Sequence, residues 1–199
     1  MNIDENRDGF HIRSIRPIDK EPFMELRKSI SIIGKAYNEV PEFLESDWIR
    51  LLESTEDHHM VVYDNNDSRF IASCSFQDIF NNNTGKESDT IELGLNVIDN
   101  LRGQGIGTRI MHELIDLGHK HFPDKELHVC VRKDNIRSIH VAEKNGGILI
   151  GKRMTPEAAI IKKALDESNT WIPKPEERDI RCMQDAIRDG TDAVLIYKV

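Results

Sequence analysis

The chain has 199 residues, of which 38% are hydrophobic and 31% charged, and its formal net charge is −8 at pH 7. This length and balance are typical of one compact globular domain, which we expect over residues 1–199. The acidic charge argues against nucleic acid as a partner, and no apolar run approaches the roughly 18 residues that would cross a membrane.

The polar start MNIDENRDGF contains no apolar targeting segment, so we expect a cytoplasmic protein. Cys74, Cys130 and Cys182 are few, odd in number and far apart, which argues against a disulfide framework and a zinc site. The eight histidines show no ligand spacing, so we expect no metal.

Hydrophobic periodicity predicts strands and helices in the first half of the chain. The segment 91–97, IELGLNV, is the clearest strand: Ile91, Leu93, Leu95 and Val97 share one face, while Glu92, Gly94 and Asn96 share the other. The segment 81–89 is polar and is predicted to be a loop. The other expected elements are strands at 10–18, 59–64 and 69–77 and helices at about 21–33 and 41–54.

In the second half, strands and helices alternate. This order predicts an α/β (α+β) fold with a mixed sheet and helices on both faces. The pattern changes over about 155–190, an insert that joins the last two strands. The expected elements are helices at 105–121 and 136–145 and strands at 126–131, 148–153 and 193–199.

Between the strand 91–97 and the next helix lies NLRGQGIGTRI, residues 100–110. The backbone N–H groups at the start of a helix lack intrahelical partners and favour an anion, and glycines let a bulky phosphate approach. A plain glycine-rich turn with a surface arginine is the alternative. A dinucleotide fingerprint fails because residue 108 is Thr108, and the Gly-Lys-Ser/Thr ending of a P-loop is missing.

The spacing R-x-x-G-x-G, met by Arg102, Gly105 and Gly107, resembles the pyrophosphate loop of the GNAT superfamily of N-acetyltransferases. Two further stretches support the resemblance: LGLNV looks like the family's splayed fourth strand, and KDNIRSIHVAEKNGG, residues 133–147, looks like its N-x-x-S/A helix. The likeness covers about residues 9–153 and the closing strand. The N-x-x-S form is similar to the branch that includes ribosomal-protein N-terminal acetyltransferases.

The resemblance implies a mixed, mostly antiparallel sheet with a splayed fourth strand, and acetyl-CoA as cosubstrate. The implied acceptor is a primary amine of a small molecule or of a protein N-terminus. Backbone groups of the splayed strand would pair with the arm of acetyl-CoA, with the Val97 N–H facing the thioester carbonyl. The implied cofactor-binding residues are Leu95, Asn96, Val97, Arg102, Gly103, Gln104, Gly105, Ile106, Gly107, Thr108 and Asn135.

Direct acetyl transfer needs a base for the amine and a proton for the leaving thiolate. Glu92, on the polar face of the splayed strand, is the predicted base, and a solvated strand residue is its alternative reading. The family's usual acid is a tyrosine four residues after the serine of the N-x-x-S/A motif, where this chain has Ala142. Ser138 is the predicted substitute, and a tyrosine placed at Ala142 would be expected to restore the acid.

Two other functions stay open from the sequence. One is a CoA-binding sensory domain without transfer activity, which the missing tyrosine favours. The other is a protein-interaction module that uses the acidic surface and the insert 155–190. A homodimer is also left open. The insert is expected to contact the acceptor because it joins the last two strands, which border the acceptor cleft in the resembled family.

Overall fold

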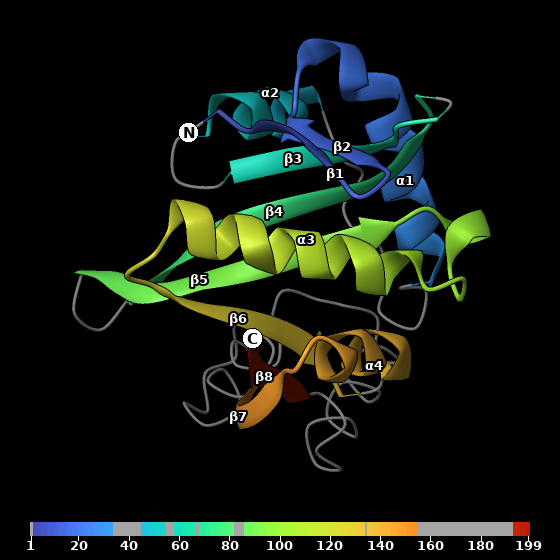
Figure 1. Ribbon diagram of the computed structural model, residues 1–199. Helices are drawn as coiled ribbons and strands as arrows, with labels where there is room; N and C mark the ends of the chain where they lie inside the picture. Colours follow the sequence, from blue (N-terminus) through green and yellow to red (C-terminus); the bar gives the residue numbers. More distant parts are fainter. Residues whose placement is uncertain are drawn as a thin grey trace, which may run out of the picture.

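The computed structural model describes residues 2–33, 45–54, 58–66, 68–81, 86–133, 135–154 and 193–199. These residues form an eight-stranded sheet in the order β1-β2-β3-β4-β5-β6-β8-β7 (Figure 1). In this part of the chain neighbouring strands are antiparallel, except that β5 and β6 are parallel. The strands are β1 (Asp4–Arg7), β2 (Phe10–Ser14), β3 (His58–Asp64), β4 (Phe70–Asn81), β5 (Lys86–Val97), β6 (Glu126–Arg132), β7 (Ile148–Met154) and β8 (Ala193–Lys198).

Helices lie on both faces of the sheet, as the sequence predicts. Figure 1 shows α3 and α4 in front of the sheet, and α1 lies on its other face. Short 3-10 turns precede α1 and the loop that leads to α3. The helical bounds are η1 (Pro17–Asp19), α1 (Lys20–Ile33), α2 (Glu45–Glu53), η3 (Asp99–Leu101), α3 (Ile106–His121) and α4 (Ile136–Lys144).

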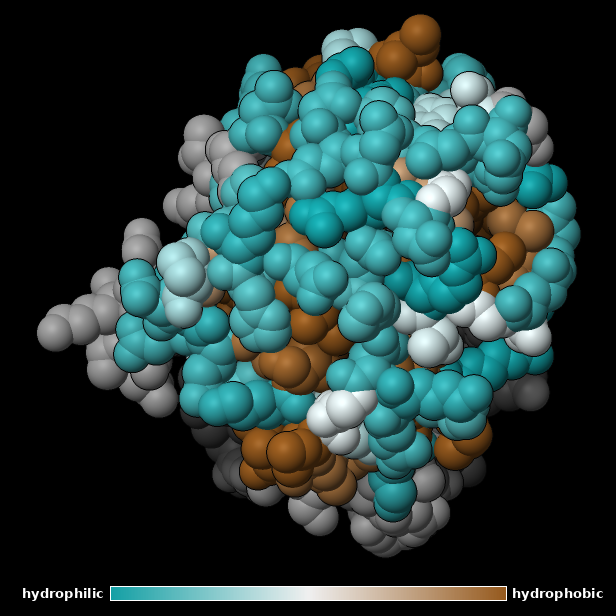
Figure 2. All heavy atoms as spheres, in the orientation of Figure 1, coloured by the Kyte–Doolittle hydropathy of each residue, from teal (hydrophilic) through white to brown (hydrophobic). Residues whose placement is uncertain are grey.

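The main hydrophobic core lies between α3, α4 and the front face of the sheet. Ile110, Leu114 and Leu117 of α3 recur at spacings of three and four residues and are fully buried. They meet strand residues such as Ile91 and Leu127. The outer side of the molecule in this view is mostly hydrophilic, with smaller hydrophobic areas between the polar side chains (Figure 2).

A smaller core on the other face anchors α1. Leu26 of α1 lies in one buried cluster with Val61 of β3 and Phe70 of β4. The rings of Phe23 and Trp48 lie 5.5 Å apart and connect α1 to α2. The placement of both helices therefore depends on how α1 begins.

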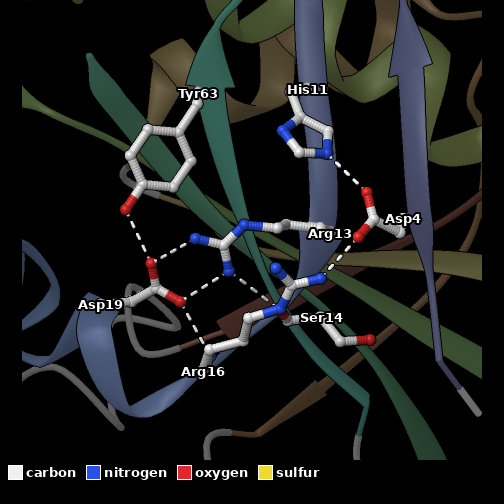
Figure 3. A network of polar contacts seen from close by, with 7 residues as sticks. All are labelled: Asp4, His11, Arg13, Ser14, Arg16, Asp19 and Tyr63. Atoms are coloured by element: carbon white, nitrogen blue, oxygen red, sulfur yellow. Dashed lines mark hydrogen bonds and ion pairs between the residues drawn. The ribbon is translucent and has the colours of Figure 1, made fainter. Parts of the chain in front are cut away.

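A buried ion pair fixes the beginning of α1 (Figure 3). The Arg13 guanidinium on β2 donates two hydrogen bonds to the Asp19 carboxylate, at 2.6 and 2.7 Å. Tyr63 of β3 donates its hydroxyl to the same carboxylate at 2.7 Å, and the Arg16 backbone N–H donates a fourth bond at 2.7 Å. The Asp19 side chain is 0% exposed, so these donors replace water completely.

The network also determines the charge states of its members. Burial opposes ionisation of Asp19, but the hydrogen bonds from Arg13, Tyr63 and the Arg16 backbone outweigh it and lower the pKa of the carboxyl. Burial, together with the bond to Asp19, raises the pKa of Tyr63 to about 12. Asp19 is therefore an anion and Tyr63 a neutral donor over the whole neutral range.

Most predicted elements are confirmed, with three corrections. The strand predicted at 10–18 ends at Ser14, because Pro17 begins η1. Residues 86–89, predicted as loop, belong to β5, which forms a long polar hairpin arm with β4. β1 was not predicted, because this charged edge strand shows no hydrophobic alternation. The beginning of the 41–54 helix, Cys182 and the insert 155–190 lie outside the described residues.

The ion pair generates a prediction about stability. Asp19→Asn should lower the free energy of unfolding by about 3–5 kcal/mol, because the buried Arg13 charge loses its counter-ion. Because the pKa of Asp19 is lowered by folding, the parent should lose this contribution as the pH falls below about 4, where the unfolded carboxyl titrates. Urea unfolding at several pH values, followed by circular dichroism, measures both effects.

Asp4→Asn is the matched control, because Asp4 also accepts bonds from an arginine and a histidine but is exposed. Its unfolding midpoint should stay close to that of the parent at neutral pH. Equal stability of Asp19→Asn and Asp4→Asn would show that the buried pair is not what holds α1.

Candidate active site

The glycine loop lies at the N-terminus of α3, where the sequence predicts it. Gly103 and Gly105 have φ angles of 77° and 79°, in the left-handed region that favours glycine. A side chain at either position would meet no heavy atom within 4 Å, so both peptides border open space. Gly105 is the N-cap of α3 and provides no side-chain cap. The N–H groups of the first turn are therefore available to a ligand.

The loop contacts β5 and α4 through Gly107. A Cβ at Gly107 would lie 3.6 Å from a Val97 methyl group and 3.9 Å from a Val141 methyl group. The Asn145 side chain at the end of α4 donates to the Thr108 carbonyl at 3.3 Å. The start of α3, the end of β5 and one side of α4 therefore meet at one point.

Two polar side chains of the loop bond within it. The Arg102 Nε donates to the Val97 carbonyl at 2.9 Å, and its Nη1 forms a 2.6 Å ion pair with Asp99. Gln104 donates its amide to the Asn100 carbonyl at 2.8 Å. The arginine charge is thus fixed beside the end of β5, and its electrostatic effect at the loop is partly compensated by Asp99.

The backbone of β5 alternates between β4 and the opposite side. The Ile98 N–H donates to the Ile71 carbonyl at 3.0 Å, so the antiparallel ladder turns the peptide groups of Ile98 and Asn96 toward β4. Leu95 and Val97 alternate with Asn96 and Ile98, so their peptide groups point away from β4. Of the three backbone partners predicted for the acetyl-CoA arm, Leu95 and Val97 therefore have outward groups, whereas the backbone of Asn96 faces β4.

Pairing between β5 and β6 ends early. The two strands are in register from Thr90–Glu126 to Glu92–His128, and no later pair joins them in the described part of the chain. We call the Glu92–His128 pair the fork. Beyond the fork β5 continues to Val97 and β6 to Arg132. This divergence is the splay that the resemblance predicts, and it frees the outward groups of Leu95 and Val97 for a ligand.

The rear face of β5 carries the polar residues of the site. Glu92, Gly94 and Asn96 lie there, opposite the main core, and their register partners on β4 include Ser73 and Ser75. Both serines are nearly buried. A Cβ at Gly94 would lie only 2.5 Å from the Ser75 hydroxyl oxygen, so glycine is what allows the two strands to fit here.

The short helix α4 contributes Asn135 and Ser138. The Asn135 side chain accepts a 3.2 Å bond from the Ser138 backbone N–H, so Asn135 is the N-cap of α4. Ala142, where the resembled family has tyrosine, is 0% exposed and belongs to the main core. A tyrosine ring would overpack that position, so the expected rescue by tyrosine does not fit the structure.

Two site features were missed by the sequence reasoning. The fork pairs Glu92 with His128, and Glu126 contacts the His128 ring at 3.2 Å. The alternation in ELHVCV places Glu126 and His128 on one face of a strand. The sequence does not show which strand lies beside it. Among the described residues, no group of three or more histidine, cysteine or acidic side chains could hold a metal, and no helix has the length and hydropathy to span a bilayer.

The chain is similar to known proteins in both sequence and fold. A model of the acetyltransferase (GNAT) family matches residues 14–147. A search of curated proteins found no match. Likeness to solved structures at 12–18% sequence identity shows the fold alone.

Three solved structures illustrate the likeness. The ribosomal-protein-S5-alanine acetyltransferase of Vibrio fischeri has a TM-score of 0.65 at 13% identity, covering 99% of this chain and 96% of that one. A chimera of the Vibrio cholerae spermidine N-acetyltransferase SpeG and hSSAT has a TM-score of 0.63 at 12% identity, covering 96% and 95%. A domain from Methanocaldococcus jannaschii has a TM-score of 0.58 at 18% identity, covering 96% and 97%.

The close contact of Gly94 and Ser75 can be tested without any ligand. Gly94→Ala should lower the free energy of unfolding by about 1–3 kcal/mol, because the new methyl group overlaps the Ser75 hydroxyl. Ser75→Ala in the same chain should restore most of the loss by removing that oxygen. Chemical denaturation of the two single variants and the double variant forms the cycle, and additive losses would contradict the contact.

Proposed function

This chain belongs to the acetyltransferase (GNAT) family, and on that premise we propose that it transfers an acetyl group from acetyl-CoA to a primary amine by direct attack. The observation that supports this most is the meeting of the uncapped N-terminus of α3 with the outward peptide groups of β5. The first suits a diphosphate and the second an amide-bearing arm. The N-terminus of α3 and the outward peptide groups of β5 both lie on the side of the fork where β5 and β6 have separated.

The glycine loop is the proposed diphosphate site. The segment from Arg102 to Thr108 would bind the phosphates through its backbone N–H groups, with Gly103, Gly105 and Gly107 allowing close approach and Gln104 and Ile106 between them. The Arg102 charge, shared with Asp99, would shift toward the phosphates when they bind. A Cβ at Gly103 or Gly105 would meet no heavy atom within 4 Å, so the backbone at these two positions borders open space.

The acetyl-bearing arm is proposed to lie along β5 as an added strand. Leu95 and Val97 would pair with its amides, while the Asn96 and Asn135 side chains would contribute further hydrogen bonds. The Val97 N–H would donate to the thioester oxygen and stabilise the charge that develops there during attack. Arg102 already donates to the Val97 carbonyl, so the N–H is the backbone group of Val97 that we assign to the ligand.

The transfer needs two proton steps at residues of this chain. Glu92 is the proposed base, which takes a proton from the acceptor amine directly or through water. Ser138, on the first turn of α4, is the proposed donor to the thiolate, with a water completing the path. Because Ala142 is buried in the core, a donor on α4 must lie nearer the start of that helix than the family's usual position.

The acceptor is proposed to be an amine of a small molecule or of a protein N-terminus, and a cytoplasmic location is proposed with it. Similar structures carry both descriptions, one a spermidine and one a ribosomal-protein acetyltransferase. The net charge of −8 favours a cationic acceptor. We also propose that residues 1–199 act as one domain and that the insert 155–190 contacts the acceptor.

A CoA-binding protein without transferase activity is the second candidate. One observation favours it: the position of the family's usual acid holds Ala142, fully buried. Turnover separates the two functions. Release of free thiol with a panel of primary amines supports the enzyme, whereas acetyl-CoA binding without release across the panel supports the sensor.

The diphosphate site predicts that acetyl-CoA stabilises the fold. A ligand that binds only the native state adds about 2.7 kcal/mol at about 100 times its dissociation constant. Arg102→Glu should remove most of this gain, because the new carboxylate repels both Asp99 and the phosphates. Unfolding midpoints with and without acetyl-CoA measure the difference within each variant.

Arg109→Glu is the matched control. Arg109 is also on the first turn of α3, but it points away from the loop and bonds to the Asp8 carbonyl at 2.7 Å. The Arg109→Glu variant should keep most of the gain in unfolding free energy that acetyl-CoA gives the parent. Equal losses in the two variants would mean that general charge, and not the glycine loop, attracts the ligand.

The two proton steps predict different pH profiles. Ser138→Ala should lower kcat and kcat/KM together by about 10 to 1,000 fold, since removing one donor aimed at developing charge costs a few kcal/mol. Glu92→Gln should reduce kcat/KM most at low pH, with the loss shrinking as the pH approaches the pKa of the amine. Initial rates over pH 6 to 10 separate the two, and full activity of Ser138→Ala would remove Ser138 from the mechanism.

A further inference from the structure

Three ionisable side chains form a connected row beside the fork. The Lys198 ammonium of β8 donates to the Glu126 carboxylate of β6 at 2.6 Å. The other oxygen of that carboxylate lies 3.2 Å from Nε2 of His128. His128 in turn is the register partner of Glu92 on one side and of Lys198 on the other.

The row lies on the rear face of the sheet. Residues paired across neighbouring strands point to the same face, so His128 and Lys198 share the rear face with Glu92, the proposed base. Their neighbours along β6, Leu127 and Val129, are buried in the main core on the other face. The His128 side chain is 13% exposed, so it is largely shielded and still reachable from the fork.

The Glu126 carboxylate determines how the ring is protonated. Hydrogen bonds from Lys198 and then His128 lower the pKa of Glu126, so the group is an anion that can only accept. Nε2 must therefore carry the proton that it shares with Glu126. A neutral imidazole then has an unprotonated Nδ1. Among the described residues, no second polar group contacts the ring.

We propose that His128 receives the proton that Glu92 takes from the acceptor ammonium, with Glu126 as its positioning residue and Lys198 fixing Glu126. This inference rests on the proposed acetyl transfer. Histidine is suited to the role because one ring nitrogen can accept a proton while the other stays hydrogen-bonded to a carboxylate. A carboxylate behind the ring also stabilises the imidazolium that forms.

The step balances in atoms and charge. One N–H bond of the ammonium breaks, and the proton passes through Glu92 to Nδ1 of His128. The electron pair left on nitrogen forms the C–N bond to the acetyl carbon. When the C–S bond breaks, its pair stays on sulfur, which takes the second ammonium proton by way of Ser138 or water. The imidazolium then releases its proton to solvent, so one proton leaves for each amide formed.

The titratable groups on the same face define the pH dependence. They are Glu92 from β5, Lys198 from β8, and Glu126 and Cys130 along β6 itself. His128→Gln keeps the size of the side chain and removes the proton acceptor. We expect kcat/KM to fall by about 100-fold or more at pH 7. The loss should shrink as the pH rises toward the pKa of the amine, where the acceptor no longer needs a base.

The first experiment reads the tautomer directly and needs no turnover. Long-range proton–nitrogen NMR of the ¹⁵N-labelled protein distinguishes the two ring nitrogens, and the signals missing from His128→Gln assign this residue. We expect the proton on Nε2 in the parent and a mixture of tautomers in Glu126→Gln. A proton on Nδ1 in the parent would overturn the inference, whatever the enzyme does.

The second experiment compares rate profiles of the parent, His128→Gln, Glu126→Gln and Glu126→Asp. Glu126→Gln should lower kcat by about 10-fold without changing the KM for acetyl-CoA, and Glu126→Asp should recover part of it. His119→Gln, an exposed histidine on α3, is the matched control and should behave as the parent. Parental kcat/KM in His128→Gln at pH 7 would overturn this inference alone, whereas no turnover by the parent with any amine would overturn the proposed function and this inference with it.

Discussion

The early end of pairing between β5 and β6 is the constraint on which the candidate site depends. Backbone N–H and C=O groups that lose a strand partner need another, and water or a ligand can supply it. The two strands can separate at the fork because the hydrophobic core beneath them is continuous. Leu127, before the fork, and Val129, beyond it, belong to the same core under α3 as Leu93. Gly118 of α3 allows this close packing, since a Cβ there would lie 2.7 Å from a Leu127 methyl group. The helix therefore holds together two strands whose hydrogen bonding has ended.

The buried Arg13–Asp19 pair has the corresponding role on the rear face. It joins β2 to the start of α1, and Tyr63 extends the connection to β3. α1 then covers part of β4 and β5, where Ser73 and Ser75 are nearly buried. A buried ion pair is weak as a source of net stability but strong as a positional constraint, because breaking it leaves a charge without a partner. The start of α1 on the rear face is thus fixed by a polar network beside a small hydrophobic cluster, whereas α3 on the front face is held by the main hydrophobic core.

Local pattern was sufficient for most of the described elements and for which residues of the candidate site share one face of β5. Strict alternation in IELGLNV correctly placed Glu92, Gly94 and Asn96 on one face, and the three glycines correctly marked the turn into α3. The features that could not be predicted depend on long-range packing: the Glu92–His128 pair and the burial of Ala142. The contacts of Arg102 with Val97 and Asp99 are local, but they depend on a loop conformation that the residue pattern does not reveal. β1 escaped detection for a different reason, since an edge strand paired on one side needs charge rather than an apolar face.

The two faces of the fork also favour the direct transfer that we propose. The proposed diphosphate site is at the start of α3, on the front of the sheet, while Glu92 and His128 point to the rear. An acetyl donor held at the front and an amine held at the rear would meet only in the gap between β5 and β6. Neither substrate would need to leave before the other enters, so no covalent intermediate on the protein is required. The proton from the amine would leave along the rear face through His128, whereas Ser138 would donate a proton to the thiolate elsewhere. Removal of one proton and donation of the other would therefore take place at separate positions.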